Sequence, residues 1–131
     1  MTRPYILLVE DNEQNCYLAS YLLESGGFEV VCVKTGAEAL VSLRRRRPDL
    51  LLTDIQLPEM DGYELGCQLR ADPEFRDLPM MALTSYAMPG DRQKAIALGF
   101  NGYLEKPINP ETFLADVRQV LRGGGSTPCA S

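Results

Sequence analysis

The chain contains no histidine and only four cysteines among its 131 residues. Most zinc sites in proteins are built from histidine and from closely paired cysteines, and none of the cysteines here forms a Cys-x-x-Cys pair. The usual zinc sites are therefore excluded. We expect Cys16, Cys32, Cys67 and Cys129 to be ordinary reduced cysteines of an intracellular protein.

The chain also lacks an excess of basic charge. It has 13 lysines and arginines against 18 aspartates and glutamates, which gives a formal net charge of −5. Because proteins bind nucleic-acid backbones mostly through clustered Lys and Arg, direct binding of nucleic acid is disfavoured. The one basic cluster, at residues 44–47, is better interpreted as the solvated end of a helix, where cations suit the helix dipole, than as a docking patch.

Long apolar runs are absent as well. The apolar run nearest the N-terminus, Tyr5 to Val9, is too short for a signal peptide or a membrane span. We therefore expect a cytoplasmic protein with no membrane association. The length fits one compact domain with its own hydrophobic core. We assign this domain to residues 1–122, and we interpret residues 123–131 as a flexible tail rich in Gly and Ser.

Short apolar segments alternate along the chain with stretches of helical periodicity. The expected strands cover residues 5–9, 30–33, 50–53, 79–83 and 102–104, and the expected helices lie near residues 12–25, 35–45, 61–72, 89–99 and 109–121. Parallel strands joined by right-handed helical crossovers form a sheet that is covered on both faces. The sequence thus predicts an α/β protein, a doubly wound five-stranded parallel sheet with helices on both sides.

Local signals support these helices. Thr35 with Glu38, and Asp61 with Glu64, have the spacing of a capping box. Asn109 is expected to cap the last helix. The helix near residues 89–99 offers few large apolar side chains, so we expect it to be the least firmly held.

Polar residues follow several of the expected strands. In an open parallel sheet, ligands bind at the edge where the strands have their carboxyl ends. Glu10, Asp11, Asp54, Thr84 and Lys106 all belong to this edge. Taken singly, Asp11 could be a helix cap and Lys106 a simple ion-pair partner.

Taken together, these residues require more than structural roles. Three carboxylates in one crevice repel each other, and Lys106 alone does not balance them. A hard cation with oxygen ligands does, and Mg²⁺ suits a site of this kind. A carboxylate beside such an ion can attack a phosphoryl group. We select Asp54 as this nucleophile because it stands alone at the end of a central strand.

Three segments carry a resemblance to a known family: "ILLVEDNEQN", "LLLTDIQLPEMDGYE" and "MMALTSYAMPGDRQKAIALGFNGYLEKPI". From Tyr5 to about Leu121, the chain resembles the receiver domain of two-component response regulators. The resemblance implies a flavodoxin-like fold with strand order 2-1-3-4-5. It also implies that Asp54 takes a phosphoryl group from a phosphohistidine on a sensor histidine kinase or histidine phosphotransfer protein.

The same resemblance implies roles for single residues. Asp11, Asp54 and the backbone carbonyl of Gln56 would bind Mg²⁺ directly, and Glu10 would help through water. Lys106 would hold a phosphoryl oxygen, and the bond from Lys106 to the following proline would be cis.

A switch is implied as well. Thr84 would move toward the phosphoryl group, and Tyr103 would then turn inward, although an aromatic residue at this place could also be plain packing. The fourth helix, the fifth strand and the fifth helix would carry the altered face to a partner. Gln56 and Tyr86 occupy positions that influence how fast the acyl phosphate hydrolyses in the family.

Other functions fit less well. A haloacid-dehalogenase-like phosphatase needs a second Asp where this chain has Gln56, and a flavodoxin needs a phosphate-cradling loop where this chain has "EDNEQN". A receiver that works without phosphorylation is disfavoured because every residue that the chemistry needs is present.

Without histidine, the chain cannot be its own phosphohistidine donor. We therefore expect a relay component that assists its own phosphorylation and dephosphorylation, and not a separate enzyme. Its output is expected through contact with a downstream protein target, as in a single-domain regulator. If the chain instead continues past its Gly-rich tail, a DNA-binding or enzymatic effector would follow.

Overall fold

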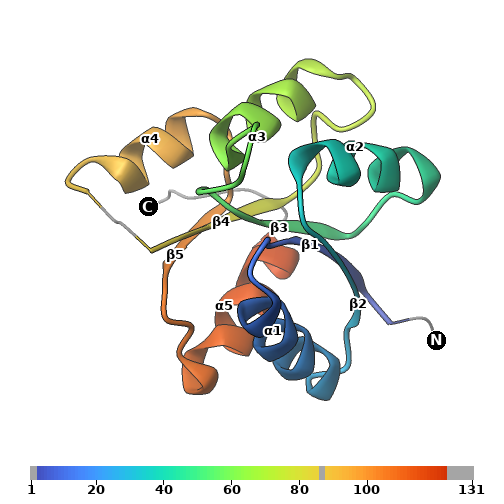
Figure 1. Ribbon diagram of the computed structural model, residues 1–131, viewed down its shortest axis with the longest axis vertical. Helices are drawn as coiled ribbons and strands as arrows, with labels where there is room; N and C mark the ends of the chain where they lie inside the picture. Colours follow the sequence, from blue (N-terminus) through green and yellow to red (C-terminus); the bar gives the residue numbers. More distant parts are fainter. Residues whose placement is uncertain (1–2, 86–87, 124–131) are drawn as a thin grey trace.

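The computed structural model describes residues 3–85 and 88–123 (Figure 1). Within these residues the strands form one parallel sheet in the order β2-β1-β3-β4-β5, which confirms the predicted fold class and strand order. The strands are β1 (Tyr5–Val9), β2 (Glu29–Val33), β3 (Leu50–Asp54), β4 (Met80–Thr84) and β5 (Gly102–Glu105). The helices are α1 (Glu13–Ser25), α2 (Gly36–Arg45), α3 (Gly62–Ala71), α4 (Asp91–Ala97) and α5 (Pro110–Gly123).

Helices cover both faces of the sheet, with α1 and α5 on one face and α2, α3 and α4 on the other (Figure 1). Successive side chains of a strand point to opposite faces, so each strand supplies both apolar cores. In β1, Ile6 and Leu8 pack toward α1 and α5, whereas Leu7 and Val9 pack toward α2 and α3. This double burial explains why the strands are apolar throughout.

The predicted helix caps are confirmed. The amide of Glu38 donates to Oγ1 of Thr35 at 3.0 Å, and the amide of Glu64 donates to Oδ1 of Asp61 at 2.8 Å. The carboxylate of Glu38 accepts from the amide of Lys34 at 2.9 Å, one residue before the cap. These contacts satisfy amides that have no partner inside the helix.

Helix α4 is short and weakly anchored, as expected. It starts only at Asp91, after Gly90 in the left-handed region at φ 91°, and no side chain caps it. Ala95 is its one buried residue. At the other end of the chain, α5 runs through Gly123, which we had expected in the tail. The rest of the expected tail and Tyr86 lie outside the described residues.

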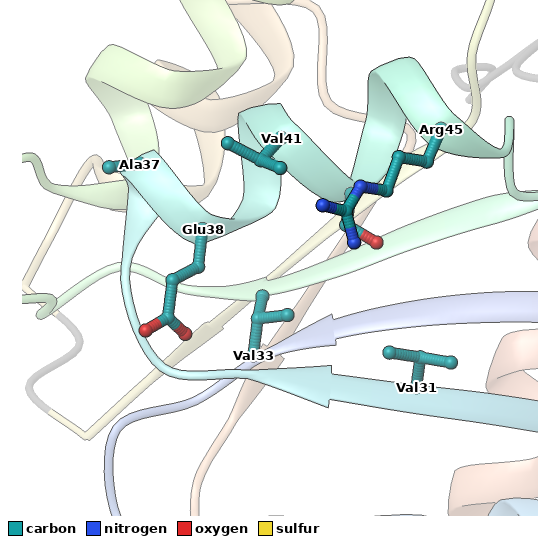
Figure 2. Close-up of a pocket in the computed structure, with 7 residues that line it drawn as sticks. Val31, Val33, Ala37, Glu38, Val41 and Arg45 are labelled. Carbon is teal, nitrogen blue, oxygen red and sulfur yellow. The ribbon is translucent and has the colours of Figure 1, made fainter.

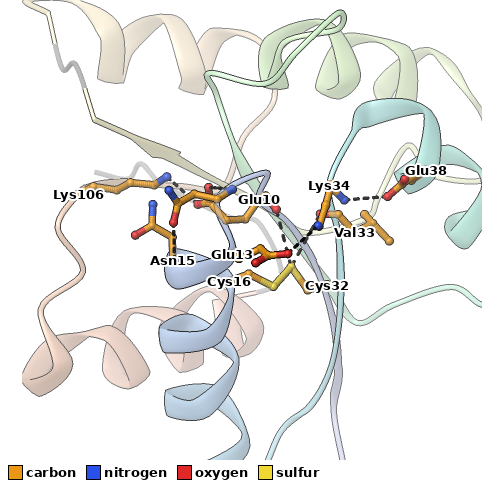
Figure 3. The surroundings of a disulfide bond; sticks show 10 residues. Glu10, Glu13, Asn15, Cys16, Cys32, Val33, Lys34, Glu38 and Lys106 are labelled. Carbon is orange, nitrogen blue, oxygen red and sulfur yellow. Dashed lines mark hydrogen bonds and ion pairs between the residues drawn. A yellow bond between two sulfur atoms is a disulfide. The ribbon is translucent and has the colours of Figure 1, made fainter.

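The expectation of reduced cysteines is wrong for one pair. Cys16 of α1 and Cys32 of β2 form a disulfide, with their Cα atoms 6.5 Å apart (Figure 3). No local motif marks this pair, because packing of α1 against the sheet brings two distant residues together. Cys67 is free and exposed, and Cys129 lies outside the described residues.

Two arginines of the basic cluster at residues 44–47 make contacts that hold neighbouring segments together. The guanidinium of Arg46 makes two hydrogen bonds to the carboxylate of Glu29, at 2.6 and 2.8 Å, and lies 4.0 Å from the ring centre of Tyr5. Arg47 donates to the backbone carbonyl of Glu74. None of the helices in the described part of the chain has the length and apolar character that crossing a membrane requires.

Candidate functional site: an acidic pocket at the carboxyl edge of the sheet

Three carboxylates meet where β1 and β3 end. Glu10 and Asp11 directly follow β1, and Asp54 is the last residue of the neighbouring β3. Each residue offers a carboxylate oxygen within 4.8 Å of those of the other two. Glu10 and Asp54 are buried, at 2% and 3% exposure, whereas Asp11 is exposed. The pocket therefore holds two shielded acids and one that faces solvent.

Lys106 reaches this pocket from the β5 side of the sheet, with β4 lying between β5 and β3. It follows β5, and its Nζ lies 2.6 Å from Oε1 of Glu10 and 2.8 Å from Oδ2 of Asp54 (Figure 3 shows the Glu10 contact). Its amide donates to the carbonyl of Thr84 at 2.7 Å, which fixes the start of the loop. The peptide bond from Lys106 to Pro107 is cis, as expected.

Burial and charge shift the pKa values in the pocket. Burial raises the pKa of Asp54 from 3.8 to about 6; the hydrogen bond from Lys106 opposes this rise, and the charge of Glu10 adds to it. Burial alone would lower the pKa of Lys106, but its hydrogen bonds to Asp54 and Glu10 outweigh burial, so its pKa is raised. The lysine thus stays charged, and one cation faces three acids.

The pocket fits a hard divalent cation. Oδ1 of Asp54 is buried and has no hydrogen-bond partner among the described residues. A buried carboxylate oxygen normally has a hydrogen-bond donor or a cation as its partner, so this oxygen is a candidate ligand for a bound cation. Asp11 and Glu10 add further oxygen ligands, and an all-oxygen set suits Mg²⁺ rather than zinc.

The side chain of Gln56 makes contacts that the sequence did not indicate. Its Nε2 donates to Oγ1 of Thr84 at 3.1 Å, and its Oε1 accepts from the amide of Ser85 at 3.3 Å. The family resemblance implies a role for the backbone carbonyl of Gln56 as an Mg²⁺ ligand and an influence of its position on hydrolysis, but no contact with Thr84. The amide joins the loop after β3 to the end of β4. The position of Gln56, two residues beyond Asp54, is the only feature of the sequence that points to these contacts.

Gly62 was also missed. Helix α3 starts against the backbone of Asp54, and a Cβ at Gly62 would collide with the carbonyl of Asp54. The amide of Gly62 donates to the carbonyl of Ile55 at 2.9 Å. The glycine of the segment "MDGYE" therefore permits close packing beside Asp54, and nothing else in the sequence marks that contact.

Tyr103 is buried, at 5% exposure, in the core on the α4 side of the sheet. The guanidinium of Arg92 lies 5.3 Å from its ring centre and donates to its backbone carbonyl at 3.4 Å. Its hydroxyl has no hydrogen-bond partner among the described residues. Burial, with the charges of Asp91 and Glu105, raises the pKa of Tyr103. The ring is thus already buried among core residues in this structure.

The fold and the pocket define a class of protein: doubly wound α/β domains with an acidic pocket and a lysine at the carboxyl edge of the sheet. The sequence profile of the response regulator receiver domain matches residues 6–118. The chain belongs to this family, whose members are signalling domains of two-component systems.

Relatives and solved structures agree with this assignment. The chain is 40% identical over 116 residues to the polar-differentiation response regulator DivK of Brucella anthropi, which covers 88% of this chain and 94% of DivK. The chemotaxis response regulator CheY4 of Vibrio cholerae superposes with a TM-score of 0.84 at 32% identity, over 91% of this chain and 99% of CheY4.

A second similar structure contains a metal. It is the receiver domain of the sensor histidine kinase PA1611 from Pseudomonas aeruginosa, solved with a magnesium ion coordinated in its active site cleft. It has a TM-score of 0.80 and 38% identity, and it covers 95% of this chain and 100% of that domain.

Proposed function

We propose that this chain is a single-domain response regulator and that Asp54 is its phosphoacceptor. The phosphoryl group comes from a phosphohistidine on a sensor histidine kinase or a histidine phosphotransfer protein. A carboxylate oxygen of Asp54 bonds to phosphorus as the bond from phosphorus to the imidazole nitrogen breaks, and the imidazole leaves with the bonding electrons. The observation that carries this proposal is the unpartnered, buried Oδ1 of Asp54 beside two acids and a lysine.

Mg²⁺ would be held by Asp11, Asp54 and the backbone carbonyl of Gln56, with Glu10 acting through water. The ion supplies positive charge next to the oxygens of the transferring group. Lys106 already binds Oδ2 of Asp54 and would hold a phosphoryl oxygen after transfer. The same groups assist hydrolysis of the acyl phosphate, so the domain takes part in its own phosphorylation and dephosphorylation without acting on other substrates.

The signal would pass through Thr84 and Tyr103. A phosphoryl group brings strong acceptor oxygens, so the hydroxyl of Thr84 gains a hydrogen bond by turning toward it. This movement would replace the hydrogen bond between Gln56 and Thr84 with one to the phosphoryl group. It would also change the space beside Tyr103. The weakly anchored α4, with β5 and α5, carries the change to the surface.

The output would be contact with a downstream protein target in the cytoplasm, with no direct binding of nucleic acid. Residues 1–122 would form the receiver domain, and the glycine-rich segment after it a tail. This part of the proposal is supported by the net charge of −5 and by the match to DivK over nearly its whole length.

Acetyl phosphate with Mg²⁺ tests the phosphoacceptor. We expect an intact-mass gain of one phosphate in the wild type and none in Asp54→Asn. Asp77→Asn is a matched control, because Asp77 is exposed and lies near the amino end of β4, away from the pocket. Equal phosphorylation of Asp54→Asn and wild type would overturn the proposal.

A further inference from the structure

An apolar groove lies on the outer side of the molecule, between β2 and α2, and the proposed phosphotransfer does not use it. β2 is an edge strand of the sheet. The groove has a volume of about 470 Å³, and Val31, Val33 and Val41 form its apolar surface (Figure 2). Val41 is 53% exposed and Val31 38% exposed. A valine cluster this open on a small domain is a candidate contact surface.

Opposite charges stand at the two ends of this groove. Glu38 lies at the beginning of α2 and Arg45 at its end, with Val41 between them (Figure 2). The two charged residues are two helical turns apart and so share one face, about 10 Å from each other along the helix axis. Both are exposed, and Arg45 makes no ion pair within the described residues.

The arrangement is complementary to itself. If two copies of the groove meet about a two-fold axis that passes beside Val41, their α2 helices run antiparallel. Glu38 of each copy then faces Arg45 of the other, and the valines meet at the centre. An interface of this kind needs self-complementary charges and an apolar middle.

We infer that the β2–α2 groove binds the same groove of a second copy of this chain. The charge pattern favours a copy over an unrelated partner, because one patch supplies both signs in two-fold register. The edge strand β2 forms one side of the groove, so a second copy seated there also covers part of this edge strand. The apolar area is small, so the dimer is weak and forms at high protein concentration.

Sedimentation velocity between about 10 µM and about 1 mM tests this inference. We expect the wild type to shift from monomer toward dimer over this range. Arg45→Glu places acids at both ends of the groove and should weaken the dimer by about tenfold or more, because both ion pairs become repulsive. Arg44→Glu is the matched control: this neighbouring arginine is exposed and does not line the groove, so its dimer should match the wild type.

Mixing supplies the sharper test. Glu38→Lys should also be monomeric alone, but Glu38→Lys mixed with Arg45→Glu restores both ion pairs and should form a heterodimer. Glu38 also supports the start of α2, so Val41→Glu serves as a second variant that leaves this cap intact. A wild type that stays monomeric at about 1 mM, or mixed variants that fail to associate while both are folded by circular dichroism, would overturn the inference.

Discussion

The side-chain amide of Gln56 lies against the hydroxyl of Thr84, with Nε2 3.1 Å from Oγ1. This hydrogen bond joins the loop that follows Asp54 to the residue that we propose as the switch. Any movement of the Thr84 hydroxyl toward a phosphoryl group must exchange this contact for a new one. We therefore expect Gln56 to stabilise the unphosphorylated arrangement of the pocket.

Replacing Gln56 should favour the phosphorylated arrangement. In Gln56→Ala, one hydrogen bond that holds Thr84 is lost, while the backbone carbonyl expected to bind Mg²⁺ remains. A hydrogen bond contributes about 1 kcal/mol, which corresponds to about fivefold in affinity. We expect beryllofluoride, a phosphoryl analogue, to bind about fivefold more tightly in a titration with Mg²⁺. Gln14→Ala, at an exposed position of α1, is the control, and equal or weaker binding by Gln56→Ala contradicts the prediction.

The raised pKa of Asp54 should make the free energy of unfolding depend on pH when no metal is bound. Because folding raises this pKa from 3.8 to about 6, the folded state binds more protons than the unfolded state between these values. Stability therefore falls as the pH rises through this window. Asp54→Asn carries no such charge, so we expect it to be more stable than wild type by about 1–3 kcal/mol at pH 7.

Chemical denaturation in EDTA at several pH values measures this difference. The advantage of Asp54→Asn should vanish below about pH 4, grow up to about pH 6 and then stay constant. An advantage that does not change with pH would assign the effect to packing and not to the charge of Asp54.

Magnesium should stabilise the fold through the same acids. A ligand that binds only the folded state, at about a hundred times its Kd, stabilises it by about 2.7 kcal/mol. We expect Mg²⁺ to raise the Tm of the wild type and to abolish most of the gain seen in metal-free Asp54→Asn. Asp11→Asn should bind Mg²⁺ at least about tenfold more weakly, whereas Asp77→Asn should bind like wild type. An unchanged Tm shift in Asp11→Asn would remove Asp11 from the ligand set.

Gly62 should tolerate no side chain. In Gly62→Ala the new Cβ meets the backbone at Asp54, which cannot move aside without shifting the pocket. We expect a loss of about 2 kcal/mol in the free energy of unfolding and weaker Mg²⁺ binding. Gly26→Ala is the matched control, because the three atoms nearest to its Cβ would all belong to the side chain of Leu114, which can rotate away. Similar losses in both variants would show that the backbone contact at Asp54 has no special cost.

The strand and helix pattern was predictable because each element carries its own local signal. The apolar strands, the caps at Thr35 and Asp61 and the weak α4 are all encoded within a few neighbouring residues. Parallel sheets bind ligands at their carboxyl edge, and this rule was enough to predict that Glu10, Asp11 and Asp54 lie together.

The contacts that escaped prediction depend on side-chain directions across elements. The Cys16–Cys32 disulfide joins a helix to a strand, and the Gln56–Thr84 hydrogen bond joins a loop to the end of a strand. Gly62 is needed because of a backbone that lies beside it in space and not in sequence. Residue spacing along one element carries no information on such pairs.

The ion pair between Glu10 and Lys106 links residues 96 positions apart, which has a consequence for the newly made chain. The ammonium group is added only after β5, later in synthesis than either of the acids that it pairs with. A ribosome-bound or C-terminally clipped chain that lacks this segment holds the acids without their lysine. Such a chain would bury two carboxylates without the cation that offsets their charge, so we expect it to fold less readily than a chain that includes Lys106.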